Sequence, residues 1–138
     1  MKTFIKISLF LLLQSICIVP ALPVNSGAIP EGIILAFRAG NAEELAKHFY
    51  TNIELIILDK EDVYSKNQAE QILRKFFTDH HPASFNIIHE GGKEASRYAI
   101  GNLSTSSGNF RVSFLIKNED GIPLIHQLRI EEEDEDNI

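Results

Sequence analysis

The chain has 138 residues, a formal net charge of −6 at pH 7, 44% hydrophobic residues, one cysteine and no tryptophan. This length and apolar content are typical of one globular domain and exclude collagen-like, coiled-coil and disulfide-dense architectures. The excess of acidic residues argues against nucleic acid and anionic membranes as partners.

The first 21 residues have the pattern of a secretory signal peptide. Lys2 and Lys6 supply a positive start, residues 7–19 are mostly apolar, and Ala21 ends a small-residue cleavage pattern. The apolar run is short for a membrane span, which needs about 20 residues, so an uncleaved anchor is the less favoured alternative. We therefore expect an exported protein, periplasmic or extracellular, with no membrane attachment once residues 1–21 are removed.

The single cysteine, Cys17, lies inside this segment. Ile16 precedes it where a lipoprotein signal needs a small side chain, so lipid attachment is not expected. Removal of residues 1–21 leaves no cysteine, which excludes disulfides, thiolate nucleophiles and zinc sites that contain cysteine. It also removes two lysines, leaving 11 Lys and Arg against 19 Asp and Glu, a net charge of −8.

Two short helices are expected at the start of the mature domain. Pro30 suits the first position of a helix whose apolar stripe runs to Phe37 and which Gly40 ends. Asn41 and Glu44 have the spacing of a capping box for a second helix. The β-branched and leucine-rich residues 53–58 then predict a buried strand.

The clearest element is a third helix. Ser65 and Gln68 form a capping box, and the helix is expected to end near His80 and Pro82. Apolar residues recur behind the cap at the spacing of one helix face, namely Ala69, Ile72, Leu73, Phe76 and Phe77.

The second half of the mature chain has the pattern of strands joined by glycine-containing turns. The expected strands are residues 85–90, 95–105, 110–117 and 122–131. Helices followed by a meander of strands predict an α+β fold, with N-terminal helices packed on a strongly bent, mostly antiparallel sheet. We expect a single domain over residues 22–131 and a disordered acidic tail over residues 132–138.

Several segments carry a resemblance to a known family. They are residues 62–70 with Phe76, Phe77 and His80, residues 98–101 with Leu103, and residues 108–112 and 127–131. On these the chain resembles an exported bacterial family called domain of unknown function 4783, of the nuclear transport factor 2-like (cystatin-like) superfamily. The resemblance covers nearly all of the mature chain and implies the same cone-shaped α+β fold. It implies no activity, because the superfamily contains isomerases, dehydratases and cyclases beside non-catalytic binding modules.

A first hypothesis places a small pocket at the open end of this cone. Strand alternation puts His126 in one row with apolar residues, and by the same rule His89 and Tyr98 face inward. Together with Tyr64 they are the expected binding pocket. The alternative is that the histidines are hydrogen-bonded core or rim residues, and a bulge in any strand would reverse these assignments.

Enzymatic activity is the alternative to simple binding. The isomerases and cyclases of this superfamily use a pocket carboxylate or an Asp–His pair as general base, but residues 95–117 contain no Asp or Glu. A base at His126 with Tyr98 as hydrogen-bond donor is the version that the sequence allows. His80 and His81 are adjacent, and adjacent side chains usually point apart; without clustered carboxylates or a third histidine at ligand spacing, we expect them to be solvated at a helix end rather than to bind a metal. We also expect no cofactor and assign no catalytic residue.

A second hypothesis concerns the opposite face of the sheet. Arg97, Arg111 and Arg129, with Gln127, are expected to face outward from successive strands. Arginine pairs bidentately with carboxylates, so a homodimer or a carboxylate-bearing partner would fit this surface. The alternative is a solvated face balanced by glutamates. The function expected from these residues is non-catalytic binding of a small ligand or a protein, and the alternative is a small-molecule isomerase, dehydratase or cyclase.

Overall fold

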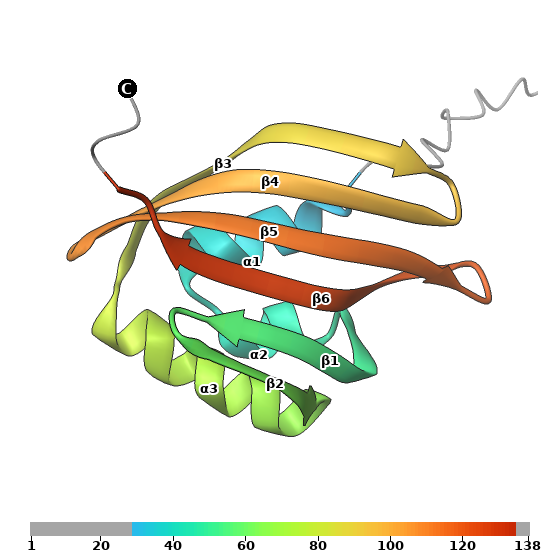
Figure 1. Cartoon of the computed structure of the whole chain (residues 1–138), viewed down its shortest axis with the longest axis horizontal. Coiled ribbons are helices and arrows are strands. Elements are labelled where there is room, and N and C mark those ends of the chain that lie inside the picture. The colour runs from blue at the N-terminus through green and yellow to red at the C-terminus, as the bar shows by residue number, and fades with distance from the viewer. Residues whose placement is uncertain (1–28, 135–138) are drawn as a thin grey trace, which may run out of the picture.

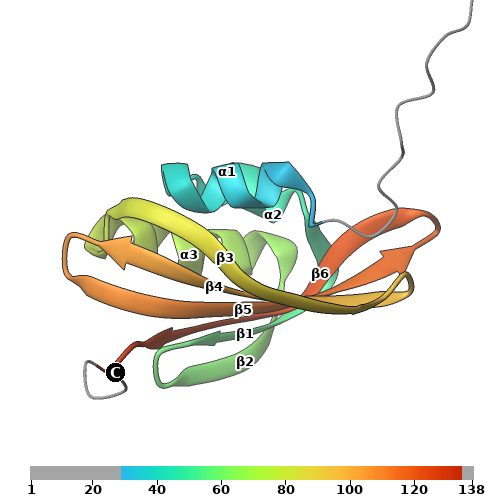
Figure 2. The ribbon, with the colours of Figure 1, turned by 90° about the horizontal axis from the view of Figure 1, so that it is seen from above.

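The computed structural model describes residues 29–134 of the chain. Within them three helices lie on one face of a six-stranded sheet that is strongly curled but open (Figures 1 and 2). The expected α+β fold, with helices first and strands after, is confirmed. The expected signal peptide, residues 1–21, lies outside the described residues. None of the helices in residues 29–134 is long and apolar enough to cross a membrane.

The elements follow the chain order of Figure 1. The helices are α1 (Glu31–Ala39), α2 (Ala42–Ala46) and α3 (Lys66–Asp79). The strands are β1 (Phe49–Ile57), β2 (Lys60–Ser65), β3 (Pro82–Lys93), β4 (Ser96–Thr105), β5 (Gly108–Glu119) and β6 (Ile122–Glu132). The sheet order is β2-β1-β6-β5-β4-β3, and every neighbouring pair is antiparallel except the parallel pair of β1 and β6.

The helix caps form as their sequences predict, with two differences. Pro30 is the N-cap residue of α1, which begins at Glu31, rather than the first helical residue. At α3 both halves of the capping box between Ser65 and Gln68 are present. At α2 the Asn41 side chain accepts a hydrogen bond from the Glu44 backbone N–H at 3.0 Å. The Glu44 carboxylate, however, accepts from Lys47 Nζ at 2.6 Å instead of folding back to the cap. The second half of this capping box is therefore replaced by an exposed ion pair.

An aromatic cluster joins the helices to the sheet. Phe37 of α1 is fully buried, and its ring centroid lies 4.6 Å from Phe85 of β3, 6.1 Å from Phe114 of β5 and 6.2 Å from Phe77 of α3. Offset and edge-on contacts at these separations stabilise a core beyond the burial of the rings themselves. The core therefore lies between the helices and the inner face of the sheet, by which we mean the face toward the helices.

The rings in this core decide which residues of β4 can face inward. Ala99, Gly101 and Leu103 lie on the inner face, opposite buried residues of β5. A Cβ atom on Gly101 would stand 2.6 Å from Cε2 of Phe85, so the Phe85 ring occupies the space above this glycine. The absence of a side chain at Gly101 of β4 thus makes room for the large Phe85 ring of β3.

Several strands extend beyond their expected bounds, and β3 and β5 do so at both ends, by three and two residues respectively. β1 begins at Phe49, four residues before the expected start, and β2 was not expected at all. At the other end, Glu132 belongs to β6, and the Glu133 N–H donates to the Asn109 carbonyl at 3.0 Å. Of the expected acidic tail, residues 135–138 lie outside the described residues.

β3 forms one edge of the sheet, and its free side is partly covered by α1. Nε of Arg38 donates to the backbone carbonyl of Phe85 at 3.0 Å. This contact occupies an acceptor on the side of β3 that has no neighbouring strand. Unpaired groups on edge strands attract other chains, so Arg38 protects this part of the edge.

Substitution of Gly101 tests the packing of Phe85 against β4. Gly101→Ala should lower the free energy of unfolding by about 1–3 kcal/mol, because the added methyl group overlaps the Phe85 ring. Combined with Phe85→Leu, which removes the ring edge, the loss should be smaller than the sum of the two single losses. Urea denaturation of the four proteins measures this coupling. Strict additivity would contradict the assignment of Phe85 as the obstructing group.

Candidate functional site

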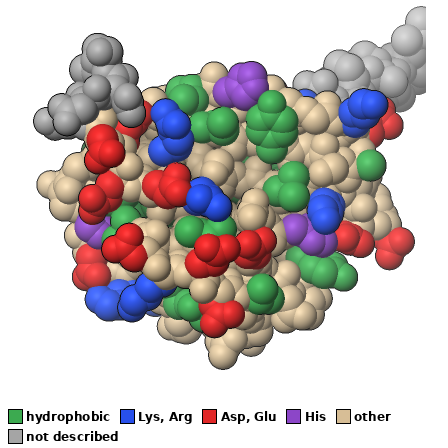
Figure 3. All heavy atoms as spheres, in the orientation of Figure 1, with side chains coloured by type: hydrophobic (Ala, Val, Ile, Leu, Met, Phe, Trp, Pro, Cys, Tyr) green, Lys and Arg blue, Asp and Glu red, His purple; other side chains and the backbone are tan. Residues whose placement is uncertain are grey.

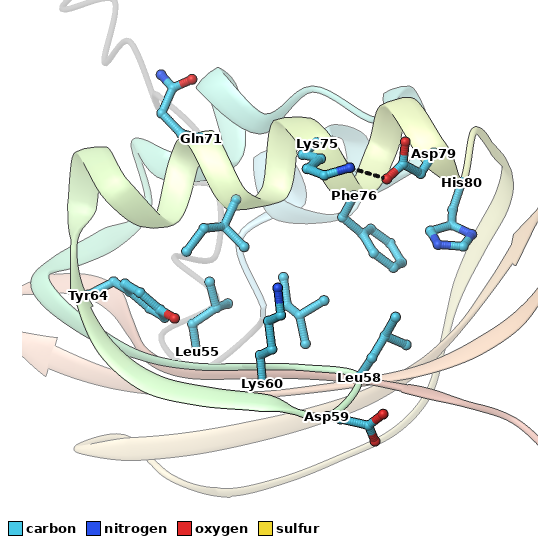
Figure 4. Close-up of a pocket in the computed structure, with 12 residues that line it drawn as sticks. Leu55, Leu58, Asp59, Lys60, Tyr64, Gln71, Lys75, Phe76, Asp79 and His80 are labelled. Carbon is cyan, nitrogen blue, oxygen red and sulfur yellow. Dashed lines mark hydrogen bonds and ion pairs between the residues drawn. The ribbon is translucent and has the colours of Figure 1, made fainter.

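A cavity of about 550 Å³ lies between α3 and the hairpin formed by β1 and β2 (Figure 4). Apolar side chains of β1 and α3 form its floor, and charged or polar side chains stand around it. The cavity is lined by Leu55, Ile57, Leu58, Asp59, Lys60, Tyr64, Gln71, Ile72, Lys75, Phe76, Asp79 and His80.

The cavity exists because α3 and β1 diverge beyond the core. The buried stripe of α3 packs into the core through Leu73 and Phe77, whereas Ile72 at its edge is only partly buried and borders the cavity. Opposite it, Leu55 and Ile57 of β1 supply the other apolar wall. Between these walls no side chain of residues 29–134 fills the space.

The turn between β1 and β2 closes one end of the cavity with an unusual backbone. Leu58 has φ of 55°, in the left-handed region that leucine rarely adopts. Its N–H donates to the carbonyl of Ile130 in β6 at 2.9 Å, which holds the turn against the sheet. The side chain lines the cavity and is 37% exposed. Residues held in such conformations cluster at functional sites, so this turn is a feature to test.

One ion pair stands on the helix side of the cavity. Lys75 Nζ lies 2.8 Å from Asp79 Oδ2, one helical turn further along α3 (Figure 4). The hydrogen bond from Lys75, and secondarily its charge, lower the pKa of the Asp79 carboxyl. The Asp79 carboxylate is therefore ionised at neutral pH and paired with Lys75.

His80 lies at the C-terminus of α3, at the same end of the cavity as the Leu58 turn and opposite Tyr64 (Figure 4). Its ring lies between those of Phe76 and Phe110, with centroids 4.8 and 4.9 Å away. Its Nδ1 also hydrogen-bonds with the Ser107 hydroxyl in the turn between β4 and β5. These contacts fix the ring and tie the end of α3 to the sheet.

Of the four expected pocket residues, the structure brings only Tyr64 to this cavity. Tyr64 lies on β2 opposite Ile53 of β1, and its hydroxyl points into the cavity in Figure 4. The other three, His89, Tyr98 and His126, lie elsewhere in the sheet.

The inward positions expected for His89 and Tyr98 are corrected to the outer face, the face away from the helices. A bulge at Ile88 reverses the alternation of β3, so that His89 pairs with Ile100 rather than continuing the inner row. Tyr98 pairs with Leu115 on the same outer face. The two residues do meet, with His89 Nε2 3.1 Å from the Tyr98 hydroxyl. The Tyr98 ring also packs over Gly91, and this contact accounts for the position of the Tyr98 side chain.

The row expected for His126 is also interrupted by a bulge. Gln127 pairs with Leu115 and Ile125 pairs with Ile116, so His126 is the extra residue between them. Ile125 takes the inner position and is fully buried. The His126 ring stacks on Tyr50 with centroids 4.2 Å apart. Its Nε2 lies 3.0 Å from Glu119 Oε1, away from the cavity residues.

The expected partner surface is only partly assembled. Arg111 and Arg129 occupy the outer face, and both contact glutamates of their own chain: Arg129 lies 2.9 Å from Glu131, and Arg111 lies 4.0 Å from Glu133. Figure 3 shows this face, where basic, acidic and apolar side chains are intermixed. Arg129 is therefore engaged within the chain by a hydrogen bond, whereas Arg111 has only a long, exposed ion pair.

Gln127 and Arg97 complete the expected partner surface, with different outcomes. Gln127 lies on the outer face, where its side-chain amide donates to Glu54 at 2.9 Å. Arg97 is not on this face. It lies opposite Ile116 on the inner side, because Gly101 and its inward neighbours set the alternation of β4. The Arg97 Nε is buried and has no hydrogen-bond partner among residues 29–134.

Most cavity residues were not expected as site residues from the sequence. Ile72 and Phe76 were recognised as part of an apolar helix stripe, but the same spacing also predicts ordinary core. Lys60 belongs to β2, whose sequence Lys-Glu-Asp-Val-Tyr-Ser has no strand-like apolar alternation. The signal that could have found the hairpin is the pair Leu58-Asp59 between an apolar run and a second extended segment.

Metal binding finds no support in the described part of the chain. Residues 29–134 contain no group of three or more His, Cys, Asp or Glu side chains placed to hold an ion. His80, one of the adjacent histidines, is engaged with Ser107.

Comparison with known proteins agrees with this architecture. The model of a family described as domain of unknown function DUF4783 matches residues 30–131. The chain belongs to the DUF4783 family. This confirms the resemblance seen in the sequence. A search of curated proteins gave no significant match.

Solved structures of DUF4783 proteins are similar over most of the chain. One from Bacteroides uniformis ATCC 8492 has 40% sequence identity and a TM-score of 0.75, covering 78% of this chain and 100% of that one. One from Bacteroides ovatus ATCC 8483 has 36% identity and a TM-score of 0.74, covering 78% and 97%. A cystatin-like domain from Nostoc punctiforme PCC 73102 shares the fold alone, with 11% identity and a TM-score of 0.61 over 75% and 72%. The nuclear transport factor 2-like fold is thereby shown for this DUF4783 chain.

The turn at Leu58 gives a test of backbone strain at the cavity. Leu58→Gly should be more stable than Leu58→Ala, because glycine adopts the left-handed region freely whereas alanine keeps the strain. We expect a difference of about 1 kcal/mol in the free energy of unfolding, measured with urea. If residue 58 had an ordinary extended backbone, the Leu58→Gly protein would be less stable than the Leu58→Ala protein. That order of stabilities would contradict backbone strain at this turn.

Proposed function

We propose that this DUF4783 chain binds a small, largely apolar molecule in the cavity between α3 and the β1–β2 hairpin, without catalysing a reaction. The observation that carries the proposal is the cavity itself, about 550 Å³ with an apolar floor and polar groups around it. Ligand pockets in proteins have volumes of about 300–1,000 Å³ and this same distribution of groups.

The chemistry of the lining residues favours binding over catalysis. A general base must be free to take a proton. Asp79 is ion-paired with Lys75, which lowers the pKa of its carboxyl, and Asp59 points away from the cavity in Figure 4. His80 is hydrogen-bonded through Nδ1 to Ser107.

The alternative enzyme, a small-molecule isomerase, dehydratase or cyclase, rested on His126 and Tyr98. Each of them has a different nearby partner, Glu119 and His89 respectively, and neither lines the cavity. This separation weighs against the two residues acting together on one substrate.

A neutral fluorescent dye tests the proposed binding. N-phenyl-1-naphthylamine, which fluoresces in apolar surroundings, should bind the wild-type chain saturably. Ile72→Trp should reduce this binding at least about tenfold, because the larger ring fills the cavity beside Leu55. Tyr98→Phe on the outer face is the matched control and should leave binding unchanged.

Circular dichroism establishes that both variants keep the fold. Absence of saturable binding to the wild-type chain, or equal binding by a folded Ile72→Trp variant, would refute the cavity as the binding site.

We further propose that the chain acts outside the cytoplasm and as a homodimer through its outer sheet face. Export is supported by the pattern of residues 1–21, and dimerisation by exposed apolar side chains on that face, with Val63 63% and Tyr98 41% exposed.

Native mass spectrometry of the protein purified from its host tests both proposals. We expect a chain that begins at Leu22, present as a dimer that Val63→Glu converts to a monomer. An intact N-terminus would contradict export with cleavage, and a monomeric wild-type chain would contradict the dimer.

A further inference from the structure

We propose that the ligand of this cavity is an amphipathic carboxylate, with its apolar body against Leu55 and Ile72 and its charged end at Lys60. The inference rests on the proposed function and names the chemical class of its ligand. It is carried by the position of Lys60, the state of the neighbouring carboxylates and the apolar character of the remaining lining.

Lys60 is placed to present its charge to the cavity. It is the first residue of β2 and pairs with Ile57, whose side chain is buried in the core, so both lie on the inner face of the sheet. In Figure 4 its side chain rises from β2 between Leu55 and Leu58 and directs Nζ toward α3. Lys60 is an exposed residue that lines the cavity, and its ammonium stands above the apolar floor.

No carboxylate of the described chain neutralises this ammonium, since Lys60 forms no ion pair within residues 29–134. Asp59 points away from the cavity, and Asp79 is paired with Lys75. Asp62 lies two positions along β2 on the same face; its carboxylate accepts a hydrogen bond from the Val63 N–H at 2.8 Å and forms no ion pair with Lys60. The charge of Lys60 is thus available to a ligand.

The residues that line the cavity favour a ligand with one negative charge on an apolar body. A lysine ammonium is a compact point charge with three donors, which suits a single carboxylate. A phosphate dianion would need further cations or an arginine fork, and the cavity lining contains no arginine. The other cation of the lining, Lys75, is already paired. The whole chain has a net charge of −6, so an anion needs a local cation to remain bound.

Displacement of N-phenyl-1-naphthylamine by three ten-carbon ligands tests the inference. Decanoate, decanol and decylamine carry the same apolar body with negative, neutral and positive ends, and each is used below its micelle-forming concentration. In Lys60→Gln we expect decanoate to bind about three- to tenfold more weakly while decanol is unchanged. In Lys60→Glu the preference should invert, so that decylamine gains and decanoate loses affinity.

Ionic strength and a matched variant separate the local charge from the general field. Added salt should weaken decanoate binding to the wild-type chain and have little effect on its binding to Lys60→Gln. Lys117→Gln removes the same charge from an exposed position on the outer face of β5, and it should leave all three affinities unchanged.

The outcomes distinguish failure of the inference from failure of the proposed function. If the dye binds and Ile72→Trp removes it, yet decanoate binds the wild-type chain and Lys60→Gln equally, the cavity stands and the carboxylate assignment is overturned. An equal loss in Lys117→Gln would also overturn it, because net charge would then be the cause. If the dye does not bind the cavity, both are overturned.

Discussion

The parallel pairing of β1 with β6 is the constraint on which the rest of the structure depends. It places Leu55 beside Leu128 and Ile57 beside Ile130, joining the first strand of the domain to the last. The β1–β2 hairpin is thereby held at the end of the curled sheet, facing α3. The bond from the Leu58 N–H to Ile130 continues this pairing into the turn. All residues that line the cavity lie between Leu55 and His80, and the pairing with β6 fixes the position of the β1 wall opposite α3.

The two faces of the sheet differ in how their polar groups are satisfied. On the outer face, Arg129, Gln127 and Arg111 are each close to a glutamate of the same chain. At the cavity, by contrast, Lys60 stands near apolar side chains without such a partner in the described chain. Charges that are already paired contribute little to the recognition of a partner, whereas an available charge beside apolar surface can choose a ligand. This contrast makes the cavity the stronger candidate site.

Features that depend on neighbouring residues were predicted correctly from the sequence, whereas features that depend on contacts between distant residues were not. The cap of α3 at Ser65 and its apolar stripe depend on neighbouring residues, so the sequence alone located this helix. The face of β3 was assigned wrongly beyond Ile88, and the face of β6 was assigned wrongly up to His126 but correctly after it, because a bulge has no fixed sequence signature. The cavity could not be predicted from the sequence. Its prediction requires knowing that Ile72 and Leu55 face each other across a space that no side chain of residues 29–134 fills.

The bond from Arg38 to the Phe85 carbonyl has a consequence for how the molecule behaves in a crowded compartment. β3 is a twelve-residue strand with one free side, long enough to template a strand from a neighbouring molecule. The guanidinium occupies one acceptor in that row, and the bulge at Ile88 breaks the regular spacing further along. A chain whose edge strands paired side by side with those of other copies would polymerise. These two irregularities make the β3 edge a poorer template for a further strand.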